Sequence, residues 1–142
     1  TQPTSLIAAF GKALEITRQK CHYNAEFYRD YIISSLQKIN GVKINGPIFD
    51  RLPNVISATI DEVKADRLVA LCDVLGIIIA KGSACKSYST EPSQTLLNIG
   101  LSEEQALSTI RISLNYDLSS EDIITATDII VSVIKRIRKS NS

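Results

Sequence analysis

The chain has 142 residues, of which 44% are apolar and 22% charged, and its formal net charge is +1. This length and composition are typical of one globular domain with a core of its own. The near-neutral charge gives no electrostatic reason to expect a nucleic acid or a membrane surface as partner, and no apolar run approaches the roughly 20 residues of a membrane helix. Three cysteines, Cys21, Cys72 and Cys85, cannot all pair and match no zinc spacing, which favours a reducing, cytoplasmic location and no metal site.

The first part of the chain carries a long helical pattern. Apolar residues recur every three or four positions from Pro3 to about Ile39, which predicts one amphipathic helix with room for a bend near residues 21–24. Asn40 and Gly41 are expected to end it, since glycine readily takes the left-handed conformation found there.

Strand and helix patterns then alternate irregularly. The elements expected first are a strand at 42–44, a strand at 55–60, a helix from Asp61 to about Leu75 that Gly76 ends, and a buried strand at 77–80. After these we expect a short helix from Pro92 to Gly100, another behind the capping box of Ser102 and Gln105, a strand at 109–114, and a last helix from Ser119. Such interleaving predicts an α+β fold, a small mixed or antiparallel sheet of about four strands packed with helices.

The segment from Lys81 to Pro92 has the composition of a surface loop. Small and polar residues surround Cys85, and Lys86 follows it directly. The thiolate is the nucleophilic form of cysteine, and both exposure and the Lys86 ammonium favour it. The segment is therefore predicted to be a mobile loop that carries a reactive thiol, although a loop cysteine taken alone is more often inert.

Several motifs resemble one family. The run GSACKSYSTEPS at residues 82–93 and the strand STIRISL at 108–114 closely resemble the C-terminal part of cysteine desulfurases, pyridoxal-phosphate enzymes of the class V aminotransferase fold. An opening TQPTSLIAAFGKALEI, the tripeptide Leu52-Pro53-Asn54 and a closing helix that starts SSEDI fit in the same order. The resemblance implies that residues 1–142 form the small C-terminal domain and that a larger domain with the cofactor lysine precedes it. The start at Thr1 and the absence of methionine agree with a fragment, which we expect to be inactive alone.

The resemblance also implies roles for three residues. The Cys85 thiolate would attack the sulfur of L-cysteine held at pyridoxal phosphate, so that alanine leaves and Cys85 keeps a persulfide. Arg111 would bind the substrate carboxylate; its alternative is a solvated arginine on the outer face of a strand. Thr1 would reach the cofactor phosphate of the partner subunit in a homodimer, although a terminal residue is by default frayed.

Partners and rival functions follow from the same resemblance. The persulfide would pass to an iron–sulfur assembly scaffold or another sulfur carrier protein. One rival is a different class V enzyme, aminotransferase-like or a cysteine lyase, in which Cys85 is dispensable; another is a non-enzymatic persulfide carrier domain. Cys21 and Cys72 fall on apolar helix faces and are predicted to be buried packing residues, and His22 is predicted to be a surface or partly packed residue.

Overall fold

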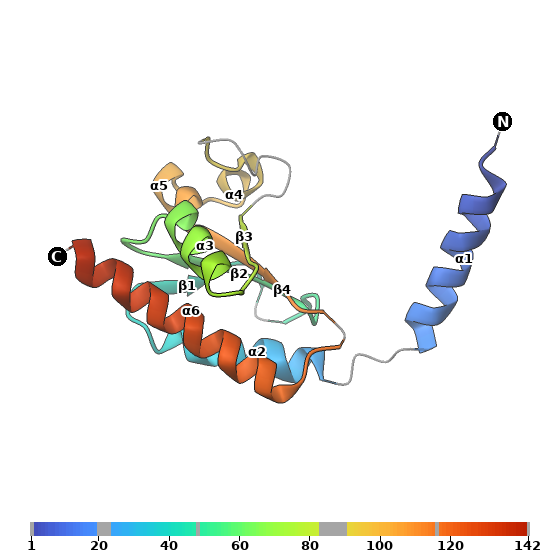
Figure 1. Ribbon diagram of the computed structural model, residues 1–142. Helices are drawn as coiled ribbons and strands as arrows, with labels where there is room; N and C mark the ends of the chain where they lie inside the picture. Colours follow the sequence, from blue (N-terminus) through green and yellow to red (C-terminus); the bar gives the residue numbers. More distant parts are fainter. Residues whose placement is uncertain (1, 20–23, 48, 83–90, 116, 142) are drawn as a thin grey trace.

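The computed structural model describes residues 2–19, 24–47, 49–82, 91–115 and 117–141. Within these ranges the helices are α1 (Thr4–Gln19), α2 (Ala25–Gln37), α3 (Ala65–Val74), α4 (Gln94–Asn98), α5 (Glu103–Leu107) and α6 (Ser120–Asn141) (Figure 1). The strands are β1 (Val42–Ile44), β2 (Val55–Ile60), β3 (Ala80–Lys81) and β4 (Thr109–Ser113).

The four strands form one sheet in the order β1-β2-β4-β3, and every neighbouring pair is antiparallel. This confirms the predicted α+β fold with a small sheet of about four strands. β4, the last strand in the chain, is inserted between β2 and β3. The insertion brings residues that are far apart in the sequence next to one another.

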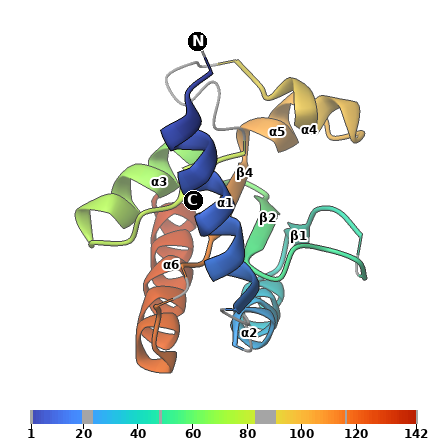
Figure 2. The same cartoon turned by 90° about the vertical axis from the view of Figure 1, so that its right-hand side faces the viewer.

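The two faces of the sheet differ in chemistry because side chains alternate along each strand. One face is apolar and carries Ile56, Ile60, Ile110 and Ile112, and helices α2, α3 and α6 pack over it. The other face is polar, as the alternation predicted for β4. Helices α4 and α5 lie next to each other at one end of the sheet (Figures 1 and 2).

Helix α6 begins with the predicted cap. The Ser119 hydroxyl donates to Asp122 Oδ2 at 2.6 Å, the Ser119 amide donates to the same oxygen at 2.9 Å, and the Asp122 amide donates back to Ser119 Oγ at 3.1 Å. The hydrogen bonds from the Ser119 hydroxyl and amide hold the pKa of the Asp122 carboxyl below its ordinary value. Ile123, Ile130, Ile134 and Ile137 are buried and form the inner stripe of the helix.

The prediction of one long N-terminal helix is wrong, because the structure has two helices. α1 ends at Gln19, and Asn24 lies in a turn before α2. α1 stands apart from the sheet in Figure 1, and its large apolar residues, such as Phe10, are exposed. Apolar residues that recur every three or four positions across both segments are compatible with one long helix or with two successive helices.

Two boundaries in the middle of the chain also differ from the prediction. Asp61 does not cap α3: its amide donates to the Gly41 carbonyl, and the helix begins only at Ala65. The run 77–80 is not a continuous buried strand, since only Ala80 and Lys81 pair with β4 and Ile78 is 86% exposed. An apolar run indicates that a segment favours burial. It does not indicate whether a neighbouring strand is available to form backbone hydrogen bonds with it.

Candidate active site beside the end of strand β3

Arg111 lies in the centre of the sheet, on its polar face. In the strand register it is opposite Ser57 of β2 on one side and Ala80 of β3 on the other. Its Nε is buried and has no hydrogen-bond partner among the described groups. A buried charged donor left without a partner is costly, so this nitrogen is suited to an external acceptor.

Strand β3 pairs with β4 beside Arg111, and the chain continues from β3 directly into the segment that carries Cys85. Ala80 is opposite Arg111, and the Gly82 amide donates to the Thr109 carbonyl at 3.0 Å. The Lys81 ammonium lies 2.6 Å from the Asp66 carboxylate at the start of α3, which fixes the strand from its other face. Cys85 itself, like the rest of 83–90, lies outside the described residues.

The chain on the far side of that segment is attached at the same place. Leu96 of α4 packs so closely on Gly82 that a Cβ built on the glycine would lie 2.4 Å from Leu96 Cδ1. Just before α4, the Ser93 hydroxyl oxygen is buried and without a hydrogen-bond partner. In the described part of the chain, Ser93 Oγ and Arg111 Nε are the two buried side-chain polar atoms without a partner, and one follows the cysteine segment while the other faces its start.

A hydrogen-bonded network extends across the same polar face. Asn45 Nδ2 donates to Ser57 Oγ at 3.1 Å and to Thr59 Oγ1 at 3.0 Å. Thr59 Oγ1 lies 2.8 Å from Thr109 Oγ1, which donates to the Gln105 carbonyl at 2.7 Å. No sequence motif indicated a role for Asn45 or Ser57. The available signal was the polar alternation of 57 and 59, which becomes informative only once the strand register is known.

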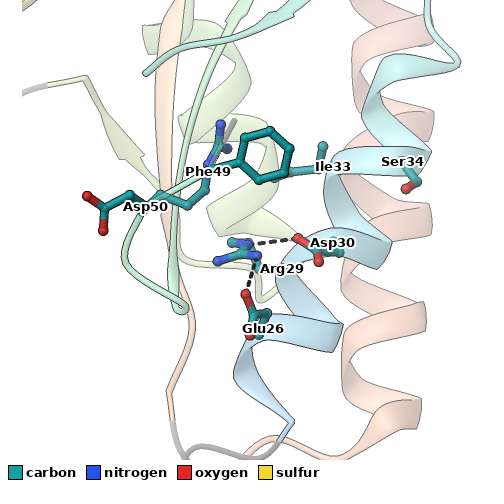
Figure 3. Close-up of a pocket in the computed structure, with 8 residues that line it drawn as sticks. Glu26, Arg29, Asp30, Ile33, Ser34, Phe49 and Asp50 are labelled. Atoms are coloured by element: carbon teal, nitrogen blue, oxygen red, sulfur yellow. Dashed lines mark hydrogen bonds and ion pairs between the residues drawn. The ribbon is translucent and has the colours of Figure 1, made fainter. Parts of the chain in front are cut away.

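A partly polar hollow lies between α2 and the loop before β2. It has a volume of about 550 Å³ and is lined by Arg29, Phe49 and Asp50 among others. Figure 3 shows Arg29 joined to Glu26 and Asp30, at 3.0 and 2.8 Å. The hydrogen bond from Arg29 to Asp30 raises the pKa of the guanidinium above its ordinary value. Unlike Arg111 Nε, the Arg29 guanidinium is already paired with two carboxylates, so Arg29 is not a free receptor for an anionic ligand.

Of the other cysteines, Cys72 is confirmed as a buried packing residue on α3. Desolvation raises the pKa of its thiol to about 11, which keeps the thiol protonated and unreactive near neutral pH. Cys21 and His22 lie outside the described residues, as does Thr1. No group of three or more histidine, cysteine or acidic side chains able to hold a metal occurs among the residues described.

Nor does any helix in the described ranges have both the length and the apolar character needed to cross a membrane. What the described residues do offer is one arginine, Arg111, with a donor that is both buried and unused. A guanidinium donor of this kind suits a carboxylate ligand.

Comparison with known proteins gives a consistent family. The family model described as aminotransferase class V matches residues 1–125. The chain is 33% identical to cysteine desulfurase IscS 1 of Archaeoglobus fulgidus, covering 93% of this chain and 35% of that protein. It is 32% identical to cysteine desulfurase IscS of Dictyoglomus turgidum, covering 97% of this chain and 36% of that protein. The chain thus spans about a third of the length of these curated relatives.

Solved structures agree. A NifS-like protein from Rickettsia africae superposes with a TM-score of 0.69 at 25% identity, over 80% of this chain and 29% of that one. Another structure titled NifS-like protein reaches a TM-score of 0.77 over 95% of this chain and 34% of its own length. Its 22% identity makes it a likeness of fold alone.

Proposed function

The chain belongs to the class V aminotransferase family, and on that basis we propose that it is the small C-terminal domain of a pyridoxal-phosphate-dependent cysteine desulfurase. The observation that carries the proposal is the buried, unpartnered Nε of Arg111 beside the strand that leads to Cys85. A carboxylate receptor on β4, next to the strand that leads to a thiol, suits the removal of sulfur from a free amino acid. The relatives named cysteine desulfurase support the same assignment.

In the proposed reaction, the Cys85 thiolate attacks the sulfur of L-cysteine and a sulfur–sulfur bond forms. The carbon–sulfur bond of the substrate breaks, the electron pair left on carbon takes up a proton, and alanine leaves. Cys85 retains the transferred sulfur as a persulfide. When bound, pyridoxal phosphate supplies the electron sink for this chemistry, and Arg111 orients the substrate through its carboxylate.

The position of Gly82 limits where the thiol can go. Cys85 follows Gly82 by three positions in the sequence, and a fully extended chain covers about 11 Å over that step. Because Gly82 is hydrogen-bonded to β4 two residues from Arg111, the thiol starts close to the proposed substrate. On the other side Pro92 follows Cys85 by seven positions, a length that would also allow the thiol to reach an external acceptor.

The rest of the proposal concerns groups outside the described residues. Thr1 would donate its hydroxyl to the cofactor phosphate of the partner subunit in a homodimer, and a preceding domain would supply the cofactor lysine. The persulfide would pass to an iron–sulfur assembly scaffold or a sulfur carrier protein. A reducing compartment such as the cytoplasm suits this chemistry, because it keeps the thiol out of disulfides.

Peptide mass spectrometry of the full-length protein, loaded with pyridoxal phosphate and exposed to L-cysteine, tests the proposal. We expect extra sulfur on the Cys85 peptide and none on the Cys72 peptide, whose thiol is buried with a pKa of about 11. Cys85→Ser should abolish both the persulfide and its transfer. Undiminished release of sulfur from the Cys85→Ser protein would refute the proposal and favour a class V lyase; loading of sulfur without any cofactor would favour a carrier domain.

A further inference from the structure

Ser57 is placed to be a second contact for the substrate carboxylate. We propose that its hydroxyl donates to the same carboxylate as Arg111, and that Asn45 holds it in the donating orientation. This inference rests on the proposed function, since it concerns how the same site holds its substrate. Its starting point is the strand register, in which Ser57 and Arg111 are directly opposite on the polar face. Such antiparallel partners have Cβ atoms about 5 Å apart.

The network ends at the Gln105 carbonyl, and this end determines which group donates in each of its hydrogen bonds. The Gln105 carbonyl can only accept, so Thr109 Oγ1 donates to it. The single Thr109 proton is then used, so Thr59 donates its own proton in the 2.8 Å contact between the two hydroxyls, in preference to the longer 3.2 Å contact with Asn45 Oδ1. Thr59 in turn accepts from Asn45 Nδ2 at 3.0 Å. The other Asn45 Nδ2 proton goes to Ser57.

This order leaves the Ser57 proton unused. Ser57 Oγ accepts from Asn45 Nδ2 at 3.1 Å, and no described residue accepts the Ser57 hydroxyl proton. The side chain is only half-buried, and therefore a ligand on this face can reach it. The hydroxyl next to Arg111 is thus a donor without an acceptor.

A carboxylate needs more than one arginine nitrogen. Its two oxygens offer about four acceptor positions, and a carboxylate removed from water is stable only when most of them are filled. The Arg111 guanidinium fills two at most in a side-on pair. Ser57, on the adjacent strand, supplies a neutral donor that adds no competing charge. Ala80, on the opposite side of Arg111, has only a methyl group and supplies no donor.

The test separates binding of the carboxylate from the sulfur chemistry. In the full-length protein loaded with pyridoxal phosphate, the dissociation constant for L-alanine is measured from the cofactor absorbance. The same titration is made with ethylamine, which lacks the carboxylate. The variants are Ser57→Ala, Ser57→Thr, which keeps a hydroxyl on a strand, and Ser113→Ala, which removes an exposed serine from the same face of β4.

For Ser57→Ala we expect the dissociation constant of L-alanine to rise by about tenfold or more, as for a hydrogen bond to a charged group. The value for ethylamine should not change. Ser57→Thr should restore most of the affinity, and Ser113→Ala should match the unaltered protein. Asn45→Ala should also weaken the binding of L-alanine and leave the binding of ethylamine unchanged, because the Ser57 hydroxyl is no longer held in its orientation.

Two results would overturn the inference. One is an equal affinity of L-alanine for the Ser57→Ala and unaltered proteins. The other is an equal loss of affinity for L-alanine and for ethylamine in Ser57→Ala. A protein that binds no L-alanine would overturn it too. The proposed function fails separately. If the unaltered protein makes no persulfide on Cys85 but Ser57→Ala still weakens L-alanine selectively, the carboxylate site stands and the desulfurase assignment falls.

Discussion

Gly82→Ala is a sensitive test of how the cysteine segment is attached. The backbone of Gly82 is not left-handed, so alanine meets no conformational strain there. The new Cβ would instead lie 2.4 Å from Leu96 Cδ1, 3.4 Å from Leu96 Cγ and 3.5 Å from Thr109 Cγ2. Leu96 is only 4% exposed, and it cannot move aside without giving up its own packing. Overpacking of this kind costs about 1–3 kcal/mol.

Equilibrium urea denaturation of the full-length protein measures that cost, and Leu96→Ala shows its origin. The single Leu96→Ala change should cost about 2–5 kcal/mol through the cavity it leaves. In the double variant the added methyl group has room, so the combined loss should fall short of the sum by about 1–3 kcal/mol, the overpacking cost that is relieved.

Gly11→Ala provides a matched control. Gly11 lies within α1, and no atom is within 4 Å of the position of its added Cβ. The same substitution should therefore stabilise by up to about 1 kcal/mol through helix propensity. Additive losses in the Gly82/Leu96 pair, or a Gly82→Ala protein as stable as Gly11→Ala, would refute the packing argument.

Two further changes test the C-terminal helix. Arg138 donates to the Asn40 carbonyl at 2.7 Å and to the Asp61 carbonyl at 2.7 and 3.2 Å; Arg138→Met should cost about 1–3 kcal/mol in urea denaturation, while the exposed control Lys139→Met should be nearly neutral. Asp122→Asn should lower the thermal midpoint near pH 7. The pKa of the folded Asp122 carboxyl lies below its ordinary 3.8, so the stabilisation by this carboxylate is present above pH 3.8 and is lost as the pH falls further. The difference in thermal midpoint between Asp122→Asn and the parent should therefore shrink below pH 3.8. A difference that stays constant with pH would contradict the reasoning.

Local signals in the sequence predicted local structure well. The capping box of Ser102 and Gln105 forms with both of its hydrogen bonds, at 3.0 and 3.2 Å. The alternation of 109–113 forms β4 with Arg111 on the polar face. Such motifs satisfy their own backbone within a few residues, so distant parts of the chain do not change them.

Features that depend on distant contacts were not predicted. Asp61 resembles a helix cap in the sequence, but its amide and carbonyl bond to Gly41 and to Arg138. These partners lie on α6 and on the turn before β1, and no local pattern indicates them. The role proposed for Ser57 depends in the same way on a strand register between β2 and β4.

The order of the strands explains why the site lies where it does. Since β4 is inserted between β2 and β3, Arg111 has a different neighbour on each side. Toward β2 it meets Ser57, whose hydroxyl is oriented by a network. Toward β3 it meets Ala80, and the chain continues from there through Gly82 to Cys85. If β3 lay next to β1 instead, the segment that carries the thiol would start three strands from Arg111 rather than one, about 10 Å further at ordinary strand spacing. That distance is nearly the full reach of three residues, so the inserted strand is what brings the proposed substrate contact and the proposed sulfur acceptor within range of each other.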